Sequence, residues 1–373
     1  MFSQRTQWAT CPNKISQLHH ELRENDDHID LTISNLTMVG LDPIQVTLPS
    51  IKTYHPDPFG LPRAREAIAQ YYKERDIEVD ASQIFVVPST SAAYSYLFRL
   101  LCNGGDVILR PRPSYPLFQY LTQLSDLESI EYIEDFDGSW FNPEQSLPEH
   151  AKAIIQVCPN NPTGHISSPH FRGLIQSLGI PVISDEVFAD YTSNFTETTW
   201  INTPEQPSIS LSGLSKVAGL PQHKLAWGVV SGPSKFREEA LQRLEIILDT
   251  YLDVSSAIQE ALPNILGQAS DWQSAVRARI EENRRWLQNH LKGTALTLLP
   301  SSGGWYAIMQ LPRTCDDEQW ASLLAQEAKL IVQPGYFYDL EKDSCVVISL
   351  ILQNQDLQTG IERLISAQQS STG

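Results

Sequence analysis

Two lysines, Lys216 and Lys224, lie eight residues apart in the segment SISLSGLSKVAGLPQHKLAWG, whose other residues are mostly small or apolar. A lysine amine can form a Schiff base with a carbonyl compound, so Lys216 is a candidate for covalent chemistry. The alternative is an ordinary surface lysine, which the apolar neighbourhood of Lys216 disfavours. The segment is therefore the first candidate site in the chain.

Hydroxyl side chains are concentrated in the segment VVPSTSAAYSYLF, where Ser89, Thr90 and Ser91 lie between an apolar run and a helical pattern. Free backbone N–H groups and the positive end of a helix at this place would suit a phosphate group. The alternative is a Ser/Thr helix cap with no ligand. The segment predicts a phosphate cradle only if other site residues lie beside it.

Two further polar residues follow apolar runs, Asn161 in CPNNPTG and Asp185 in PVISDEVF. Taken singly, Asn161 could belong to a turn and Asp185 could be a cap or a loop ligand. In open α/β sheets, however, ligands bind beyond the carboxyl ends of the strands, and both residues fall at such ends. We therefore treat them as site candidates.

The elements that must position these groups are short apolar runs alternating with helical patterns. Between residues 40 and 240 this alternation predicts a largely parallel sheet covered by helices. Further helices are predicted over residues 14–25, from Leu61, over 235–249 and 255–268, and in the charged segment from Asp271.

The last hundred residues hold fewer strand patterns and predict a smaller α+β unit. We expect an α/β fold with two domains. The large domain would comprise residues 31–254, and the small domain would comprise residues 1–30 together with 255–373.

Composition excludes several classes of protein. The net charge of −17 over 373 residues argues against nucleic acid and anionic lipid as partners, because the long-range field repels phosphates. The five cysteines are scattered, so neither a metal site nor a disulfide framework is expected. The N-terminus shows no secretory pattern and no run is apolar enough to cross a membrane, so we expect a cytoplasmic protein.

A family resemblance covers nearly the whole chain. The segments STSAAY, GGDVILRPRPSYP, NPTG, SDEVF, SLSGLSK, SSGGWY and VQPG follow in this order, with Tyr54 and Gly60 before them. Together they resemble the class I/II pyridoxal-phosphate-dependent aminotransferases of fold type I, in the aspartate aminotransferase-like superfamily. The resemblance implies pyridoxal 5′-phosphate as cofactor, an amino donor, a keto acid or aldehyde acceptor, and a homodimer with shared active sites.

The resemblance also assigns roles to residues. Lys216 would form the Schiff base and then shuttle a proton, and Asp185 would pair with the ring nitrogen, so these two are the catalytic candidates. Asn161 would donate a hydrogen bond to the ring oxygen. Tyr115 would stack on the ring, although core packing is the alternative for this tyrosine.

The phosphate of the cofactor would be held by Thr90, Ser91 and the N–H of Ala92, with Tyr54 reaching over from the partner subunit. Lys224 stands where most of the family has a phosphate-binding arginine. A lysine is a point charge and not a bidentate fork, so phosphate binding should survive with weaker geometric control.

The chain departs from the family at three further positions. Gly213 stands where a serine usually contacts the phosphate, with Ser212 and Ser215 as possible substitutes. Phe188 replaces a tyrosine that would bond the ring oxygen. Val347 replaces the arginine that would hold the substrate α-carboxylate.

The loss of this arginine leaves two alternatives open. Another cation could hold the carboxylate, with Arg112 and Arg5 as candidates, or the donor could lack an α-carboxylate. In the second case Val347, with Trp305 or Tyr306, would form an apolar wall.

We therefore expect an aminotransferase with an atypical substrate. The alternatives are another pyridoxal-phosphate reaction on the same fold, namely a β-lyase, a decarboxylase or an amino-acid cyclase, and a non-catalytic binding protein. Intact Lys216, Asp185 and Asn161 count against the last.

Overall fold

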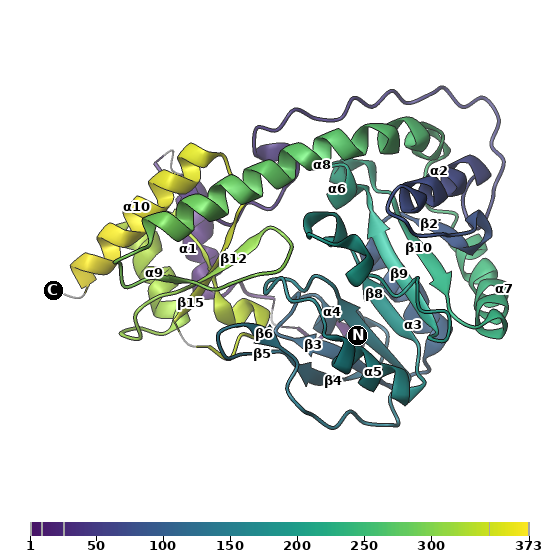
Figure 1. Cartoon of the computed structure of the whole chain (residues 1–373), viewed down its shortest axis with the longest axis horizontal. Helices are drawn as coiled ribbons and strands as arrows, with labels where there is room; N and C mark the ends of the chain where they lie inside the picture. Colours follow the sequence, from purple (N-terminus) through teal and green to yellow (C-terminus); the bar gives the residue numbers. More distant parts are fainter. Residues whose placement is uncertain (1, 9, 25–26, 343, 372–373) are drawn as a thin grey trace.

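The structure is a computed structural model that describes residues 2–8, 10–24, 27–342 and 344–371. It contains a seven-stranded sheet and a four-stranded sheet, and the helix α8 (Ser256–His290) passes over both (Figure 1). The four-stranded sheet lies near the C-terminus of the chain. The predicted α/β class with a smaller α+β part is confirmed.

The seven-stranded sheet has the order β2-β10-β9-β8-β7-β3-β4. Its members are β2 (Ile84–Val87), β10 (Ala226–Ser231), β9 (Ser208–Gly213), β8 (Val182–Asp185), β7 (Ala153–Val157), β3 (Val107–Arg112) and β4 (Glu128–Ile133). All neighbouring pairs are parallel except the two that involve β10, which runs opposite to the others. The expectation of a largely parallel sheet was right.

Helices cover both faces of this sheet, which explains why its central strands are buried along their whole length. Ile155 and Ile183 pack on one face with residues of α3 (Thr90–Leu101) and α7 (Ser234–Tyr251). Their neighbours Ile154 and Val182 pack on the other face with α5 (Pro169–Leu178). Adjacent strand residues point to opposite faces, so both layers are needed to bury them.

The four-stranded sheet has the order β11-β12-β15-β14 and is antiparallel throughout. Its strands are β11 (Thr297–Leu298), β12 (Tyr306–Gln310), β15 (Cys345–Ser349) and β14 (Gln333–Pro334). The helices α9 (Asp317–Glu327) and α10 (Asn354–Ser371) lie beside it, and α1 (Lys14–Arg23) contacts α9. The N-terminal chain is tied in by β1 (Ile29–Asp30), which pairs in parallel with β13 (Leu330–Ile331).

One prediction about the helices was wrong. The patterns at 255–268 and from Asp271 belong to one continuous helix, α8. Ala269 and Ser270 join the two patterns, and neither residue breaks a helix. The other predicted helices appear as α1, α2 (Pro62–Lys73) and α7.

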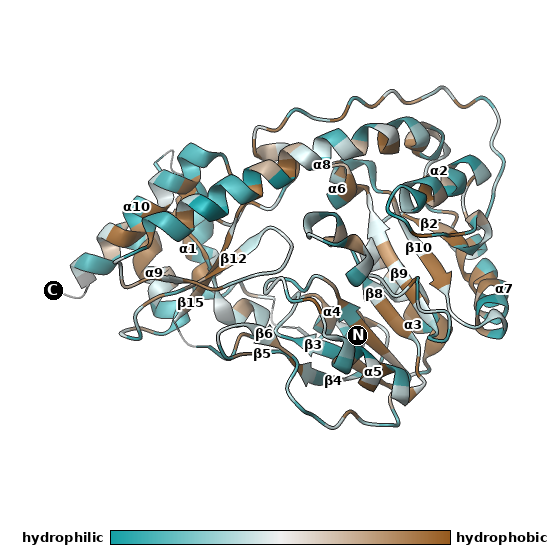
Figure 2. Cartoon of the chain, viewed as in Figure 1, coloured by the Kyte–Doolittle hydropathy of each residue, from teal (hydrophilic) through white to brown (hydrophobic). Residues whose placement is uncertain are grey.

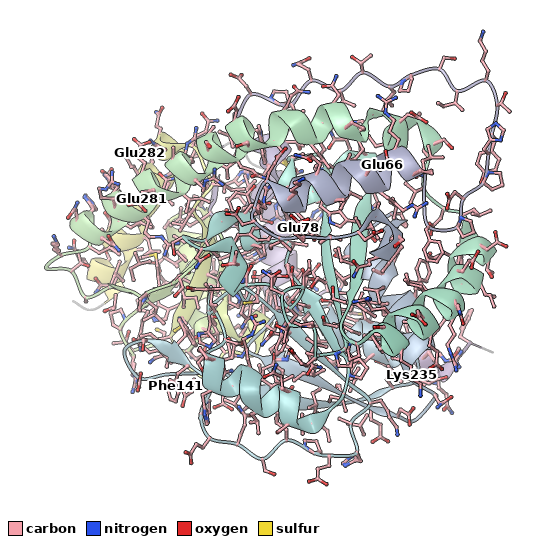
Figure 3. The ribbon with its side chains drawn as sticks, turned by 45° about the vertical axis from the view of Figure 1, so that its right-hand side comes forward. Glu66, Glu78, Phe141, Lys235, Glu281 and Glu282 are labelled. Atoms are coloured by element: carbon pink, nitrogen blue, oxygen red, sulfur yellow. The ribbon has the colours of Figure 1, made fainter. Side chains whose placement is uncertain are left out.

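Polarity follows the layers. In Figure 2 the strands of the central sheet are mostly brown, whereas the outer sides of the helices are mostly teal. Glu66 on α2 and Glu281 and Glu282 on α8 are exposed acidic residues of these outer sides (Figure 3). Among the described residues, no helix combines the length and apolarity that a membrane span requires.

One long segment between η2 (Leu36–Met38) and α2 contains neither helix nor strand. It runs along the outside of the molecule beyond α2 and α8 (Figure 1). It exposes Leu48, Ile51 and Tyr54, whose side chains are 48%, 40% and 59% accessible. Long segments without secondary structure are uncommon in compact folds and usually have a function.

Candidate active site

A cavity of about 340 Å³ lies at the carboxyl ends of the parallel strands. Most of the predicted site residues line it, namely Thr90, Ser91, Tyr115, Asn161, Asp185, Lys216 and Lys224. Ser34, Phe188, Ser215 and Tyr306 line it as well. Segments from seven parts of the chain therefore meet in one place.

Lys216 is carried by α6 (Leu214–Val217), a single helical turn that follows β9 directly. Its Nζ lies 4.8 Å from the centre of the Trp305 ring and 5.7 Å from that of Phe188. Burial lowers the pKa of the Lys216 amine to about 8, although the negative charge of Asp185 opposes this shift. A larger fraction of the amine is therefore unprotonated near neutral pH than in an exposed lysine.

Asp185 is the last residue of β8, and its side chain is buried. Burial raises the pKa of Asp185 to about 6. Hydrogen bonds from the Val187 N–H (3.2 Å) and the Tyr94 hydroxyl (3.0 Å), together with the charge of Lys216, act against this rise. The carboxylate is thus held in place by two donors beside the lysine.

Tyr94 is a site residue that sequence reasoning missed. It lies inside the segment STSAAY, and its hydroxyl contacts Asp185 across the sheet. Burial and the nearby carboxylate raise the pKa of Tyr94, which keeps the hydroxyl protonated as a donor. The sequence could have indicated Tyr94, because it lies on α3 four residues after Thr90 and residues at this spacing share a helix face.

The start of α3 combines a cap with a cavity wall. Ser89 is the N-cap residue, and its hydroxyl oxygen accepts the Ala92 N–H at 3.1 Å. Thr90 and Ser91 line the cavity, whereas Ala92 does not. The cap alternative therefore holds for Ser89, and the Ala92 N–H predicted to contact phosphate is already engaged.

Asn161 and Tyr115 lie on the cavity wall in different surroundings. Asn161 is buried, and its side-chain oxygen has no hydrogen-bond partner among the described residues. Tyr115 is 37% exposed and meets Phe118 edge-on. Burial raises the pKa of Tyr115 to about 12, so its hydroxyl is neutral. An unpartnered buried amide is costly unless a ligand completes its hydrogen bonds.

Gly213 has a steric explanation. A Cβ atom at this position would come within 2.7 Å of the Ala226 Cβ on the neighbouring strand β10. A serine cannot be placed here without moving that strand. Of the two proposed substitutes, Ser215 lines the cavity and Ser212 is buried outside it.

Neither arginine proposed to replace the missing one lines the cavity. Arg112 pairs with Glu131 at 3.3 Å and Glu341 at 3.1 Å, and Arg5 pairs with Asp126. The basic side chains that line this cavity are Lys216 and Lys224.

Val347 lies in an apolar cluster and does not line the cavity. It is 1% exposed and packs with Ile308 and Tyr338, with Tyr306 and Trp140 against the same cluster. Trp305 is also fully buried and absent from the wall. Of the three residues expected to form an apolar wall, only Tyr306 does so.

Tyr54 lies apart from this cavity. It lines a separate, smaller cavity with Pro58, Leu252 and Ser256. Within one chain it therefore makes no contribution to the wall described above.

Ser34 was not singled out from the sequence. It precedes every motif by many residues, and no pattern marks it. Its position on the wall depends on β1 pairing with β13, which brings the N-terminal chain beside the four-stranded sheet.

The fold is that of a fold type I enzyme. The aminotransferase class I and II family matches residues 48–364 of the chain. The chain belongs to this family and is an aminotransferase.

Similar proteins carry the same description. The glutamate-pyruvate aminotransferase AlaA of Escherichia coli K12 is 26% identical over 342 residues, covering 84% of each chain. The tyrosine aminotransferase of Dictyostelium discoideum is 24% identical and covers 77% of this chain and 74% of its own. The solved alanine aminotransferase of Pyrococcus furiosus superimposes with a TM-score of 0.86 at 20% identity, covering 99% and 100% of the two chains. This last likeness establishes the fold.

Proposed function

We propose that this chain binds pyridoxal 5′-phosphate in the cavity and transfers an amino group from a donor to a keto acid or aldehyde, with Lys216 as the Schiff-base residue. The observation that carries the proposal is that Lys216 and Asp185 line the same cavity, where burial brings their pKa values to about 8 and about 6. The unpartnered amide oxygen of Asn161 supports a ligand at the same place.

Each residue has a role that its surroundings permit. The Lys216 amine is in part unprotonated near neutral pH, so it can attack a carbonyl and later move a proton at the substrate carbon. The Asp185 carboxylate, held by Tyr94, would stabilise a proton on the ring nitrogen. Pyridoxal phosphate, when bound, supplies the electron sink that the protein lacks.

The phosphate would lie at the start of α3, where Thr90 and Ser91 offer hydroxyls and Lys224 adds a positive charge. Tyr115 would stack on the ring, and Asn161 would bond the ring oxygen. Because the Ala92 N–H is already bonded to Ser89, the hydroxyls and Lys224 carry most of the proposed phosphate contacts.

We propose further that the donor is atypical. No arginine in the described part of the chain lines the cavity, and the position expected for it is filled by Val347 inside an apolar cluster. A substrate carboxylate would find no bidentate partner there. Amines without an α-carboxylate suit the aromatic side of Tyr306 and Phe188 better.

The assembly proposal rests on the exposed segment that carries Leu48, Ile51 and Tyr54. Exposed apolar side chains on such a segment would be covered by a second subunit of a homodimer, which would also place Tyr54 at the neighbour's phosphate. We retain the division into domains of residues 31–254 and of 1–30 with 255–373, and a cytoplasmic location, as parts of the same proposal.

Half-reaction spectroscopy tests the reaction type. Adding an amine donor without acceptor should convert the bound cofactor to its amine form, which absorbs at shorter wavelength. Release of product while that form fails to accumulate would instead indicate a β-lyase, a decarboxylase or a cyclase. No spectral change with any donor would contradict catalysis.

A further inference from the structure

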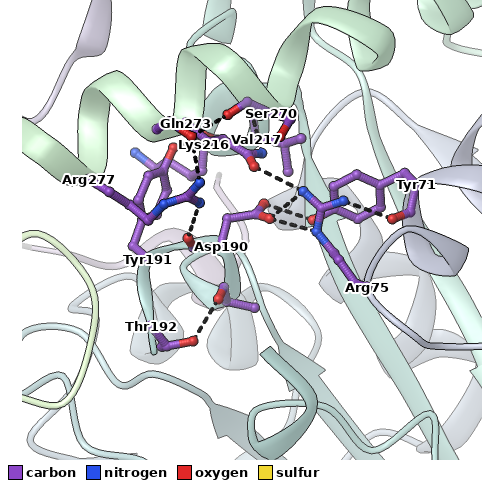
Figure 4. A network of polar contacts seen from close by, with 12 residues as sticks. Tyr71, Arg75, Asp190, Tyr191, Thr192, Lys216, Val217, Ser270, Gln273 and Arg277 are labelled. Carbon is purple, nitrogen blue, oxygen red and sulfur yellow. Dashed lines mark hydrogen bonds and ion pairs between the residues drawn. The ribbon is translucent and has the colours of Figure 1, made fainter. Parts of the chain in front are cut away.

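The helical turn that carries Lys216 is held by side chains from outside the cavity. Because α6 is one turn long, its last carbonyl groups have no partners within the helix. The Tyr191 hydroxyl donates to the Lys216 carbonyl oxygen at 2.6 Å, and the Gln273 Nε2 donates to the Val217 carbonyl oxygen at 2.8 Å. Two consecutive carbonyls of the lysine turn are therefore capped by side chains (Figure 4).

The orientation of the Gln273 amide is fixed by Arg75. The guanidinium offers only donors, and its Nη2 donates to the Gln273 Oε1 at 2.9 Å. The oxygen end of the amide must therefore face Arg75, and the NH₂ end must face Val217. Gln273 is 1% exposed, so water cannot take over either contact.

Arg75 is in turn held by Asp190. Its Nε donates to the Asp190 Oδ1 at 2.8 Å, while the Tyr71 hydroxyl donates to the other carboxylate oxygen at 2.7 Å. Asp190 and Tyr191 are neighbours in η4 (Ala189–Tyr191), which follows Asp185 closely in the chain. The segment η4 therefore contacts the lysine turn directly through Tyr191, and indirectly through Asp190, which holds Arg75 and so Gln273.

The helix α8 completes the arrangement. Arg277 donates to the Asp190 carbonyl oxygen at 3.0 Å, one turn along from Gln273 (Figure 4). The lysine turn lies close to α8 because Gly219 packs against Trp272, and a Cβ at Gly219 would come within 2.3 Å of that ring. The contact brings the Val217 carbonyl within reach of Gln273.

We propose that Tyr191 and Gln273 are positioning residues that fix the backbone of Lys216, with Arg75 and Asp190 holding Gln273 in the required orientation. The proposal rests on the proposed function, in which Lys216 forms the Schiff base. Neither residue is assigned to the cavity chemistry itself. They act by keeping the lysine amine at the reacting carbon, where small displacements are costly.

The test uses the full-length apoprotein mixed with pyridoxal phosphate, and follows growth of the visible absorbance band. Tyr191→Phe and Gln273→Met should each slow this step by about tenfold, because a misplacement of about 1 Å can cost up to about a hundredfold. In the loaded enzyme both should lower kcat and leave KM unchanged. Tyr72→Phe is the control, because its buried hydroxyl accepts from Trp227 and bonds no atom of the lysine turn.

Gln273→Glu separates positioning from anchoring. Its ionised carboxylate can accept from Arg75 but cannot donate to Val217, so we expect it to be as slow as Gln273→Met. Recovery of the wild-type rate in Gln273→Glu, or an unchanged rate in Tyr191→Phe, would overturn the proposal. Borohydride reduction of the wild type tests the proposed function separately. If the adduct forms on Lys216 but the variants load the cofactor at the wild-type rate, the positioning proposal is wrong and the proposed function stands. If no adduct forms on Lys216, both proposals are wrong.

Discussion

The two ends of the cavity differ in the side chains that line them: one end is rich in polar and charged groups, and the other is mainly aromatic and apolar. At the end where α3 and β8 meet, Asp185 is held by Tyr94 and lies beside Lys216, with Thr90 and Ser91 close by. At the opposite end, the four-stranded sheet contributes Tyr306, which packs against the apolar cluster around Val347, and no arginine among the described residues lines the wall.

This difference separates two requirements of the chemistry. The groups proposed to hold the cofactor occur at strand ends, where the parallel sheet brings distant segments together. The groups that would choose the substrate come from the smaller sheet, where Val347 is buried at the position at which the resemblance leads us to expect an arginine. We therefore propose that this cavity combines the family's reaction with an atypical donor.

Replacing Asp185 by Asn should produce the largest effect. The neutral amide keeps the size of the side chain but cannot hold a proton on the ring nitrogen, so turnover should fall by well over a hundredfold while the cofactor still binds. Steady-state rates measure this, with the exposed Asp135→Asn as control. A rate within about tenfold of the wild type, or roughly 1.4 kcal/mol of barrier, would make Asp185 a structural residue.

The substrate end is probed by donor pairs. Each α-amino acid should be a poorer donor than its decarboxylated amine by about tenfold or more, because a charged hydrogen bond of about 1.5–3 kcal/mol has no partner. Conversion of the bound cofactor to its amine form gives the rates. Arg112→Gln should leave the ratio unchanged, since Arg112 is paired with Glu131 and Glu341. A preference for the amino acid over its amine would contradict the proposal of an atypical donor, and loss of that preference in Arg112→Gln would identify Arg112 as the partner of the carboxylate.

The pH dependence of cofactor loading tests the environment of Lys216. With a pKa of about 8, only about a tenth of the amine is unprotonated at pH 7, so the rate of Schiff-base formation should rise about tenfold between pH 7 and its plateau. Asp185 raises this pKa, so Asp185→Asn should move the midpoint to lower pH. A midpoint near 10.5, the ordinary value, would show that Lys216 is not desolvated.

Tyr54→Phe should have the smallest effect, a several-fold loss of cofactor retention without unfolding, because one hydroxyl contact to the phosphate is lost. The exposed Tyr120→Phe is a matched control. Dialysis followed by absorbance measures retention, and light scattering measures the assembly. A fully loaded and active monomer would defeat the shared-site proposal.

The fold could be predicted because its signals are local. Apolar runs and helical patterns predicted the strands and most helices, and the order of the motifs predicted the family. The continuity of α8 across Ala269 and Ser270 was missed because a change from an apolar to a charged pattern resembles a boundary.

The candidate site could be predicted only in part. Residues after strand ends were placed on the wall as expected, because strand polarity determines where they fall. The contact of Tyr94 with Asp185, the ion pairs of Arg112 and the packing around Val347 depend on segments far apart in the chain. The hydrogen bond from the Ala92 N–H to the Ser89 hydroxyl is local, but the sequence is equally compatible with a Ser89 hydroxyl that caps α3 and one that contacts a phosphate.

The proposed function depends above all on Lys216 forming the Schiff base in this cavity. Borohydride reduction of the cofactor-loaded protein, followed by peptide mapping, tests it directly. We expect a reduced pyridoxyl group on Lys216, its loss in Lys216→Met, and its retention on Lys216 in Lys224→Met. A group on Lys224 in the wild type, or no modified lysine in a protein that retains the cofactor, would contradict the account.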